Sequence, residues 1–436
     1  MRKPKFKNLR SPLAGENEKA MNVAVLCQVF GVLAMQSIEQ NGLLILYFRR
    51  LGLSASLILS LLSVVSLLQA VIRIPASHRA DQMGRKRMGQ AGSILGTTAV
   101  VLIVLTGFGG EQVVRAFAVI SILFFAAGEG LFSSGWHSIL HPIIPSGKRG
   151  RFFGVLRFSW QISGIVFAAC ASLLLERFPT VRMYQIIFAV IALGAFTRFF
   201  LYRTLPELQV KEYRKYPFIG ALKKILRQPG FVRFIVYVSI RFLLAGAVLQ
   251  VLALLEREVL GFSEGKVVML ANFGLIGNLA GFVIGAFLVD RRSKRPFFMI
   301  THIGIGLLSA AFLLRFFMNA ELVVFYYGVL HFFLGFMIAS FSIAMTAKEY
   351  SLITTDRKAL ALSFSGFAFI GSRALSRLIA SLLLHPAVLP QKSAVAGVVL
   401  SNYDVVLFIF GAGLLLTTPL AGIVPGLKKE SGLTNA

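Results

Sequence analysis

The sequence predicts an all-α membrane protein with twelve transmembrane helices in two pseudo-symmetric six-helix bundles, and three observations support this. The 436 residues are 56% hydrophobic and only 14% charged, whereas about a quarter of a soluble domain is charged. Runs such as 88–110 and 405–425 contain no charged residue and match the roughly 20 residues that cross a bilayer. A charged hinge also occurs twice, once in each half of the chain.

The hinge belongs to a longer internal repeat. Leu51–Ser54 reads Leu-Gly-Leu-Ser and begins 30 positions before Asp81, while Leu260–Ser263 reads Leu-Gly-Phe-Ser and begins 30 positions before Asp290. The two copies are 209 residues apart in a chain of 436. A fixed offset of this kind indicates a duplicated half.

Charged and glycine-containing turns divide the first half into six expected spans. After a tail at 1–19, the first bundle covers 20–202. Its spans are 20–48, 54–76, 88–109, 112–135, 152–175 and 183–202. The basic hinge follows the second span, and a loop at 136–150 that ends in bases follows the fourth.

The second half repeats this plan after a polar linker at 203–233. The linker holds eight Lys/Arg and three prolines and is too short for a domain; 222–227 within it is either a surface helix or solvated chain. The second bundle covers 234–425, and a tail covers 426–436. Its spans are 234–255, 266–289, 296–318, 322–347, 359–384 and 404–425, with a loop at 385–402 before the last.

The positive charges are sorted by loop. Of the 45 Lys/Arg, 30 lie in the tails and in alternate loops, which is the positive-inside pattern and places both termini in the cytoplasm. The formal charge of +27 is therefore a topology signal, and nucleic acid is not expected as a partner. Short loops favour a bacterial inner membrane over a eukaryotic plasma membrane. Cys27 and Cys170 both lie within spans, so we expect neither a disulfide nor a metal site.

The two halves, the central basic linker and the repeated hinge together resemble the major facilitator superfamily of secondary transporters. The hinge motif of that family reads Gly-x-x-x-Asp-Arg-x-Gly-Arg-Lys. The matching residues are Asp81, Gly84, Arg85 and Lys86 in the first copy and Asp290, Arg291, Lys294 and Arg295 in the second. Ser77 and Gln82 replace the first glycine and the first arginine. We expect the aspartates to latch the halves through the arginines and a facing helix N-terminus; the alternative is a solvated loop that only sets topology.

Two other patterns of the resemblance are incomplete. Many members carry Arg-x-x-x-Gly-x-Gly in the fourth helix; Gly128 and Gly130 match, but Phe124 stands at the arginine position. The Gly-Pro pair that ends the fifth helix of many drug–proton antiporters is missing from this sequence, which argues against a drug antiporter.

Ionisable residues inside the spans are candidates for function because each costs at least about 2.5–3.5 kcal/mol to insert. Glu39 and Glu129 are candidates for proton coupling, since a carboxyl group in a low-dielectric cavity can load and release a proton near neutral pH. The alternative is that each is paired with an arginine. Arg241 is the strongest candidate for a substrate anchor, because a guanidinium suits a carboxylate or phosphate; its alternative role is to neutralise Glu39.

Other polar residues at useful depths are weaker candidates for a substrate site. They are Gln36, Gln40, Asn41, Trp160, Gln161, Asn272, Arg373 and His331. Arg373 shares a helix face with Arg377, and interhelix contacts are the alternative role for both. His331 is either a satisfied core histidine or a proton relay. Snorkelling to the interface explains the arginines near span ends, Arg73, Arg115, Arg198 and Arg315.

These features predict a secondary transporter that moves a small organic solute by alternating access. The excess of arginines over glutamates in the spans favours an organic anion, and the acidic residues favour proton coupling. Two alternative functions also fit the sequence: an uncoupled facilitator of a neutral solute such as a sugar, and a receptor or lipid-handling scaffold that does not transport. We expect no enzyme activity, cofactor or metal, since the sequence contains no catalytic constellation or phosphate-binding loop. A monomer suffices for the mechanism.

Overall fold

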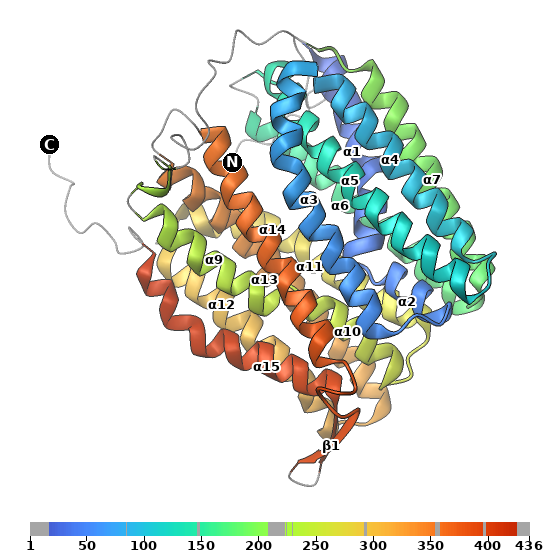
Figure 1. The fold of residues 1–436 in the computed structure, drawn as a ribbon. Coiled ribbons are helices and arrows are strands. Elements are labelled where there is room, and N and C mark those ends of the chain that lie inside the picture. Colours follow the sequence, from blue (N-terminus) through green and yellow to red (C-terminus); the bar gives the residue numbers. More distant parts are fainter. Residues whose placement is uncertain are drawn as a thin grey trace, which may run out of the picture.

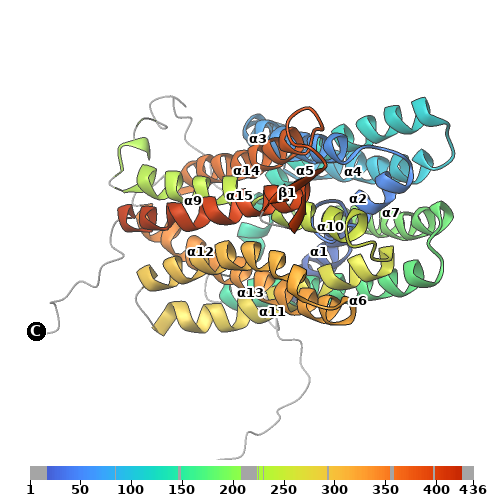
Figure 2. The same ribbon diagram turned by 90° about the horizontal axis from the view of Figure 1, so that it is seen from below.

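The computed structural model describes residues 17–83, 85–145, 149–207, 223, 225–228, 230–291, 294–353, 358–395 and 398–424. Within them, twelve helical segments are long and apolar enough to cross a membrane, which confirms the predicted number. Figures 1 and 2 show the helices of the two halves as two bundles side by side.

The described part of the first half contains seven helices, of which the first two cover the predicted span 20–48. They are α1 (Glu18–Glu39), α2 (Leu43–Arg50), α3 (Ala55–Met83), α4 (Arg85–Thr106), α5 (Glu111–Ile143), α6 (Arg149–Arg177) and α7 (Val181–Thr204). The loop predicted at 136–150 is shorter than expected, because α5 continues to Ile143.

The second half has a similar order. Its elements are α9 (Phe231–Ala245), α10 (Val248–Glu258), α11 (Glu264–Arg291), α12 (Lys294–Ala311), η2 (Phe312–Phe317), α13 (Ala320–Leu352), α14 (Lys358–Leu383), α15 (Asn402–Thr417) and η3 (Thr418–Ile423). Strands β1 (Lys392–Val395) and β2 (Val398–Ser401) form an antiparallel hairpin in the loop predicted at 385–402.

The first span of each half is broken, although a continuous helix was predicted in both. α1 ends at Glu39 and α2 starts at Leu43, with Gly42 in the left-handed region at a φ of 77°, which glycine adopts without steric cost. In the second half α9 ends at Ala245 and α10 starts at Val248. Broken helices expose backbone polar groups at membrane depth, and in transporters such breaks accompany binding sites.

Small residues allow α11 and α13 to approach closely. A Cβ atom on Gly277 would collide with the Phe332 carbonyl oxygen, and one on Gly281 would lie 2.5 Å from the Phe336 carbonyl oxygen. Gly285 faces the Ser340 backbone in the same way. The glycines that recur every four residues on α11 therefore have a packing role.

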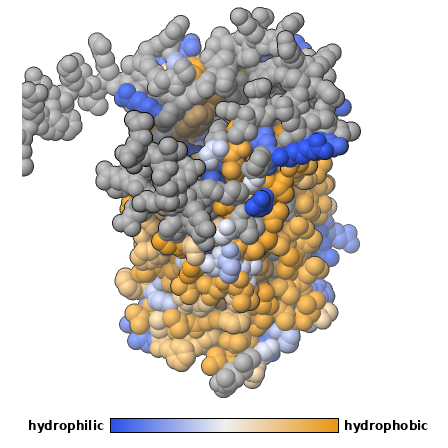
Figure 3. Space-filling model, turned by 90° about the vertical axis from the view of Figure 1, so that its left-hand side faces the viewer, coloured by the Kyte–Doolittle hydropathy of each residue, from blue (hydrophilic) through white to orange (hydrophobic). Residues whose placement is uncertain are grey.

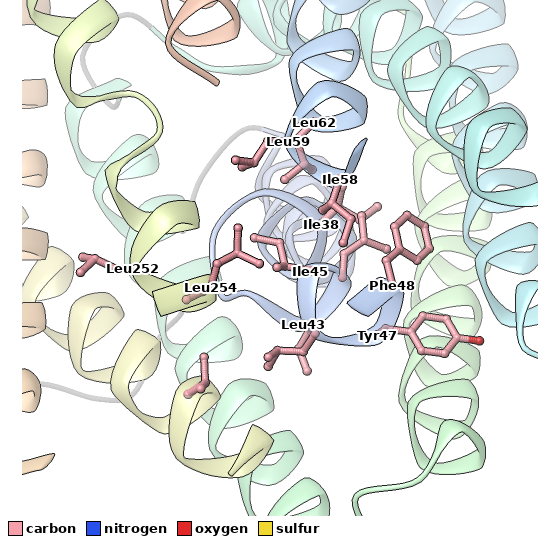
Figure 4. Packing of buried hydrophobic residues seen from close by; sticks show 14 of the residues in the cluster. Ile38, Leu43, Ile45, Tyr47, Phe48, Ile58, Leu59, Leu62, Leu252 and Leu254 are labelled. Atoms are coloured by element: carbon pink, nitrogen blue, oxygen red, sulfur yellow. The ribbon is translucent and has the colours of Figure 1, made fainter. Parts of the chain in front are cut away.

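The two ends of the bundle pack differently. We call the end with α2, α10 and the β-hairpin the hairpin end, and the end with the α3–α4 and α11–α12 turns the hinge end. At the hairpin end one hydrophobic cluster joins both halves, and Figure 4 shows Leu254 of α10 beside Ile45 of α2. This end is therefore closed by side chains from both halves.

Toward the hinge end the described core divides into two clusters, one in each half. The first contains Phe132, Trp136 and Tyr202, and the second contains Phe234 and Phe341. No residue of the described chain belongs to both. The two halves are thus packed together at the hairpin end and have separate cores at the hinge end.

The outer surface of the bundle is apolar. Figure 3 shows hydrophobic residues over most of the described surface on one face. Large side chains such as Leu193, Phe325 and Leu416 are 65%, 72% and 81% exposed. Twelve apolar helices with such a surface identify an integral, multi-pass membrane protein.

Candidate functional site

Arg241 lies inside the segment Phe231–Glu258, which is long and apolar enough to cross a membrane, and it has no described acidic partner. It is ten residues beyond Phe231, the first residue of α9 at the hinge end, which is about 15 Å along the helix. Its side chain is buried, and the Nε and Nη2 atoms form no hydrogen bond with a described residue. The guanidinium carbon lies 3.3 Å from the centre of the Phe341 ring, so a cation–π contact holds the charge in place.

Arg373 of α14 lies near Arg241, and Arg377 lies one turn beyond Arg373 on the same helix. The Arg373 guanidinium carbon is 4.6 Å from the centre of the Phe242 ring, and Phe242 packs against Phe341 with ring centroids 6.2 Å apart. Arg373 is within electrostatic range of Arg241, of the Glu39 carboxylate and of Arg377, one turn further along α14. The described residues thus bring three guanidinium groups into one region.

Glu39 is the carboxylate closest to this group. One of its oxygens lies 3.5 Å from Arg377 Nη2, and Gln69 Nε2 donates to the other at 3.3 Å. At the break after α1, Gln250 Nε2 of the second half donates to the Glu39 carbonyl oxygen at 2.7 Å. In this structure Glu39 pairs with Arg377, whereas no ion pair joins it to Arg241 among the described residues.

Arg377 also fastens the two halves together. Its Nη1 atom donates to the Leu62 carbonyl oxygen at 3.0 Å and to Ser66 Oγ at 2.9 Å, both on α3. The remaining atom, Nε, is buried and hydrogen-bonds to no described residue. Arg377 is thus an interhelix contact, as the sequence suggested, and lies at the edge of the arginine group.

Other buried carboxyl groups are engaged elsewhere in the bundle. The pairs are Glu129–Arg198 at 2.7 Å, Asp404–Arg315 at 2.5 Å, Glu256–His331 at 2.6 Å, and Glu349 with the Ser365 hydroxyl. The described chain therefore offers three guanidinium groups and one carboxylate in the central region. Snorkelling, which was expected for Arg198 and Arg315, is wrong because both side chains are buried in ion pairs.

The sequence analysis identified only one member of the pair formed by Glu256 and His331. His331 was a candidate, whereas Glu256 falls one residue beyond the predicted end of its span. In the structure α10 extends to Glu258, which brings Glu256 inside. Arg257 and Glu258 follow Glu256 directly, so the sequence carries no signal that separates Glu256 from the charged end of a span.

The uncharged candidates are spread over both halves. Asn41 Oδ1 accepts a hydrogen bond from the backbone N–H of Leu43, the first residue of α2, at 3.2 Å. Gln161 Nε2 donates to the Leu275 carbonyl oxygen of the other half at 3.0 Å. Gln36 is buried against Gly164, and Asn272 has a buried side-chain oxygen without a described hydrogen-bond partner. Gln40 directly follows α1, and Trp160 is half-buried on α6. They do not form one cluster around Arg241.

Only part of the hinge motif can be described. Gly84 lies outside the described residues, and so do the side chains of Asp81, Arg85, Asp290, Arg291, Lys294 and Arg295. The backbone N–H of Lys86, in the first turn of α4, donates to Glu207 at 3.2 Å. A carboxylate thus stabilises the N-terminus of α4, and the latch between halves stays a prediction.

Ion pairs across the halves close the hairpin end, and the sequence did not reveal them. Arg50 of α2 donates to Glu264 of α11 at 2.8 Å, and Arg49 lies 2.5 Å from Glu258 of α10. Glu264 is 2% exposed and also lies 3.5 Å from Arg257. The Ser56 and Ser381 hydroxyl groups add an inter-half hydrogen bond at 3.0 Å.

Comparisons with known proteins agree with this architecture. The sequence profile of the Major Facilitator Superfamily matches residues 25–380. A comparison with curated proteins finds no match. Similar solved structures include a POT family transporter in complex with 5-aminolevulinic acid, a D-xylose–proton symporter and the nucleoside transporter NupG.

These three structures share the fold at low sequence identity. The TM-scores are 0.72, 0.69 and 0.64, and the identities are 14%, 16% and 12%. The matches cover 94%, 94% and 95% of this chain and 97%, 98% and 99% of the other chains. At such identity the likeness establishes the fold alone.

Proposed function

The chain belongs to the Major Facilitator Superfamily, and we propose that it is a proton-coupled secondary transporter of a small organic anion. The fold is that of a transporter, but proteins with this fold include a nucleoside transporter and a D-xylose–proton symporter. The substrate class must therefore come from the residues of the central site.

The unpaired arginines carry the proposal. Arg241 and Arg373 have buried nitrogen atoms without hydrogen-bond partners among the described residues, and a buried charge is costly unless it is paired. An anionic substrate would supply the missing charge and acceptors. Guanidinium groups favour carboxylate and phosphate because these accept two parallel hydrogen bonds.

The packing of the two halves supports alternating access. The hairpin end is sealed by a shared hydrophobic cluster and by inter-half ion pairs, whereas the cores near the hinge end are separate. A rocking motion that opens the hairpin end would break those ion pairs and expose the arginines to the other side.

Glu39 supports coupling to protons. It is the one described carboxylate at the arginine group, and its pairing with Arg377 over 3.5 Å is loose. Protonation of Glu39 would free Arg377 and raise the positive charge available to an anion. Glu129 is held more tightly by Arg198 at 2.7 Å, and its pairing with an arginine supports a structural role.

The distribution of bases supports an orientation. The hinge end carries the basic loops, so the positive-inside pattern places it in the cytoplasm with both termini. A bacterial inner membrane is the membrane we propose, and the chain works as a monomer, since both halves of the site come from one chain.

Uptake into proteoliposomes under an imposed pH gradient tests the function. A panel of carboxylates, phosphate esters and neutral sugars would be offered while internal pH is followed. Accumulation of an anion with proton movement, lost in Arg241→Gln, supports the proposal. Equilibration of a neutral sugar without proton movement would instead indicate a facilitator, and ligand binding or lipid movement without uptake would indicate a receptor or lipid-handling scaffold.

A further inference from the structure

A buried histidine–glutamate pair lies in the second half, apart from the arginine group. Glu256 is on the last turns of α10 and His331 is in the middle of α13. The distance from His331 Nε2 to Glu256 Oε1 is 2.6 Å, and the side chains are 3% and 1% exposed. A contact this short requires a proton between the two atoms.

Each partner also has one atom that is buried and unsatisfied. Glu256 Oε2 and His331 Nδ1 hydrogen-bond to no described residue. A purely structural pair would be expected to use these atoms, because burying an unsatisfied polar group costs about 1–3 kcal/mol. His302, the other buried histidine that the structure describes, has both nitrogens satisfied, by the Tyr237 hydroxyl at 3.1 Å and the Leu414 carbonyl oxygen at 2.9 Å.

The charged groups around the pair are already neutralised by other partners. On η2 and α15, Arg315 forms two bonds with Asp404, at 2.5 and 2.7 Å, and Asp404 also accepts from Ser401. Tyr327, on α13, donates its hydroxyl to the Phe312 carbonyl oxygen at 3.2 Å.

The charged groups near the hairpin end are also engaged. On α10 and α2, Glu258 pairs with Arg49. Glu258 also accepts a hydrogen bond from Tyr403 of α15 at 2.7 Å. Arg257 lies near Glu264 of α11, and Glu264 pairs with Arg50.

The elements packed beside the imidazole add no charge. Gly274 of α11 faces the ring, and a Cβ atom there would lie 3.9 Å from Nδ1. The Phe312 ring is 5.7 Å from the imidazole ring. With no free countercharge among these residues, a carboxylate beside a neutral imidazole would leave one negative charge in an apolar site, so the pair is stable only when it holds a proton.

We propose that Glu256 and His331 form a proton-binding site that exchanges with the hairpin side and is sealed in the present conformation. Glu256 precedes Glu258 by two residues on α10, the helix that Arg49 fastens to the first half. Opening the hairpin end moves α10 and admits water to the pair. The site takes up one proton from that water and returns one to it, with no other reactant. Only its role in coupling rests on the proposed transport function.

Nuclear magnetic resonance of the full-length protein in lipid nanodiscs, with ring-¹⁵N-labelled histidine, tests proton binding without any substrate. The His331 signals are assigned by their loss in His331→Gln, and His302 serves as an internal control. We expect the His331 ring to change protonation with pH while His302 stays neutral. Glu256→Gln should weaken proton binding at His331 about tenfold or more, because the facing carboxylate is lost. Glu111→Gln, at an exposed carboxylate that pairs with Arg115 on its own helix in the first half, should leave proton binding unchanged.

A second readout keeps the proposal falsifiable if Glu256→Gln fails to fold. Infrared difference spectra of His331→Gln should lose the pH-dependent carboxyl band that we assign to Glu256. A His331 ring and a carboxyl band that stay constant over the whole accessible pH range would overturn the proposal. Titration of the pair without transport of any solute would refute the proposed function alone, and proton-driven uptake with an inert pair would refute this inference alone.

Discussion

The guanidinium group of Arg50 reaches from the first half of the molecule to the carboxylate of Glu264 in the second, at 2.8 Å. Glu264 is 2% exposed, and Arg257 of its own half lies 3.5 Å away. A clasp of this kind stabilises the conformation in which the hairpin end is closed. Its strength sets how often that end opens.

We expect Arg50→Gln to shift the protein toward conformations open at the hairpin end. Arg257 remains 3.5 Å from Glu264, so the buried carboxylate keeps a cationic partner and we expect the variant to fold. Cysteines at Ser56 and Ser381, whose hydroxyls lie 3.0 Å apart across the halves, would report the change in a background without Cys27 and Cys170. Oxidative cross-linking should be efficient in the parent and reduced in Arg50→Gln.

The control for this experiment is Arg115→Gln. Arg115 pairs with Glu111 on the same helix, and the two side chains are 64% and 75% exposed, so the pair contributes little. Equal cross-linking in Arg50→Gln and the parent would contradict the role of the clasp.

Arg241→Gln should abolish anion uptake without lowering thermal stability. The substitution removes a buried charge that lacks a described acidic partner, so no ion pair is broken. Thermal unfolding in detergent and uptake in proteoliposomes measure the two effects. A large loss of stability would show that Arg241 holds the fold together.

Arg315→Gln should behave in the opposite way. It leaves the buried carboxylate of Asp404 without its bidentate partner, and breaking a buried pair costs about 3–5 kcal/mol. The expected result is a marked drop in Tm. Stability equal to that of the parent would indicate that water replaces the lost arginine.

Glu39→Gln should separate exchange from accumulation. The amide still accepts from Gln69 but cannot release a proton, so counterflow of substrate should continue while accumulation driven by a pH gradient is lost. Glu129→Gln is the matched variant, because it breaks the 2.7 Å pair with Arg198; it should lower stability and keep coupling. If Glu129→Gln loses coupling and Glu39→Gln keeps it, the coupling proton binds at Glu129 on α5 and not at Glu39.

Gly277→Ala should weaken the packing of α11 on α13. Its Cβ would collide with the Phe332 carbonyl oxygen, and overpacking of this kind costs about 1–3 kcal/mol. Gly371→Ala, in α14, has no atom within 4 Å of the added Cβ and should leave Tm unchanged. A similar Tm for both variants would mean that α11 shifts without penalty.

Much of the architecture could be predicted from the sequence because it depends on local composition. Apolar runs of membrane length gave the twelve helices, and the offset of 209 residues gave the two halves. The breaks before Leu43 and Val248 were missed although Asn41-Gly42 is a turn signal, because the long apolar runs on both sides of each break were assigned to one span.

The partners of the buried charges were decided by tertiary structure. The sequence marked Glu39, Glu129, Arg241 and His331 as unusual, because an ionisable group inside a span is costly wherever it lies. It could not pair Glu129 with Arg198, Arg315 with Asp404 or His331 with Glu256, since these partners are 69, 89 and 75 residues apart. An ion pair depends on the distance between side chains, and that distance is set only when the helices pack.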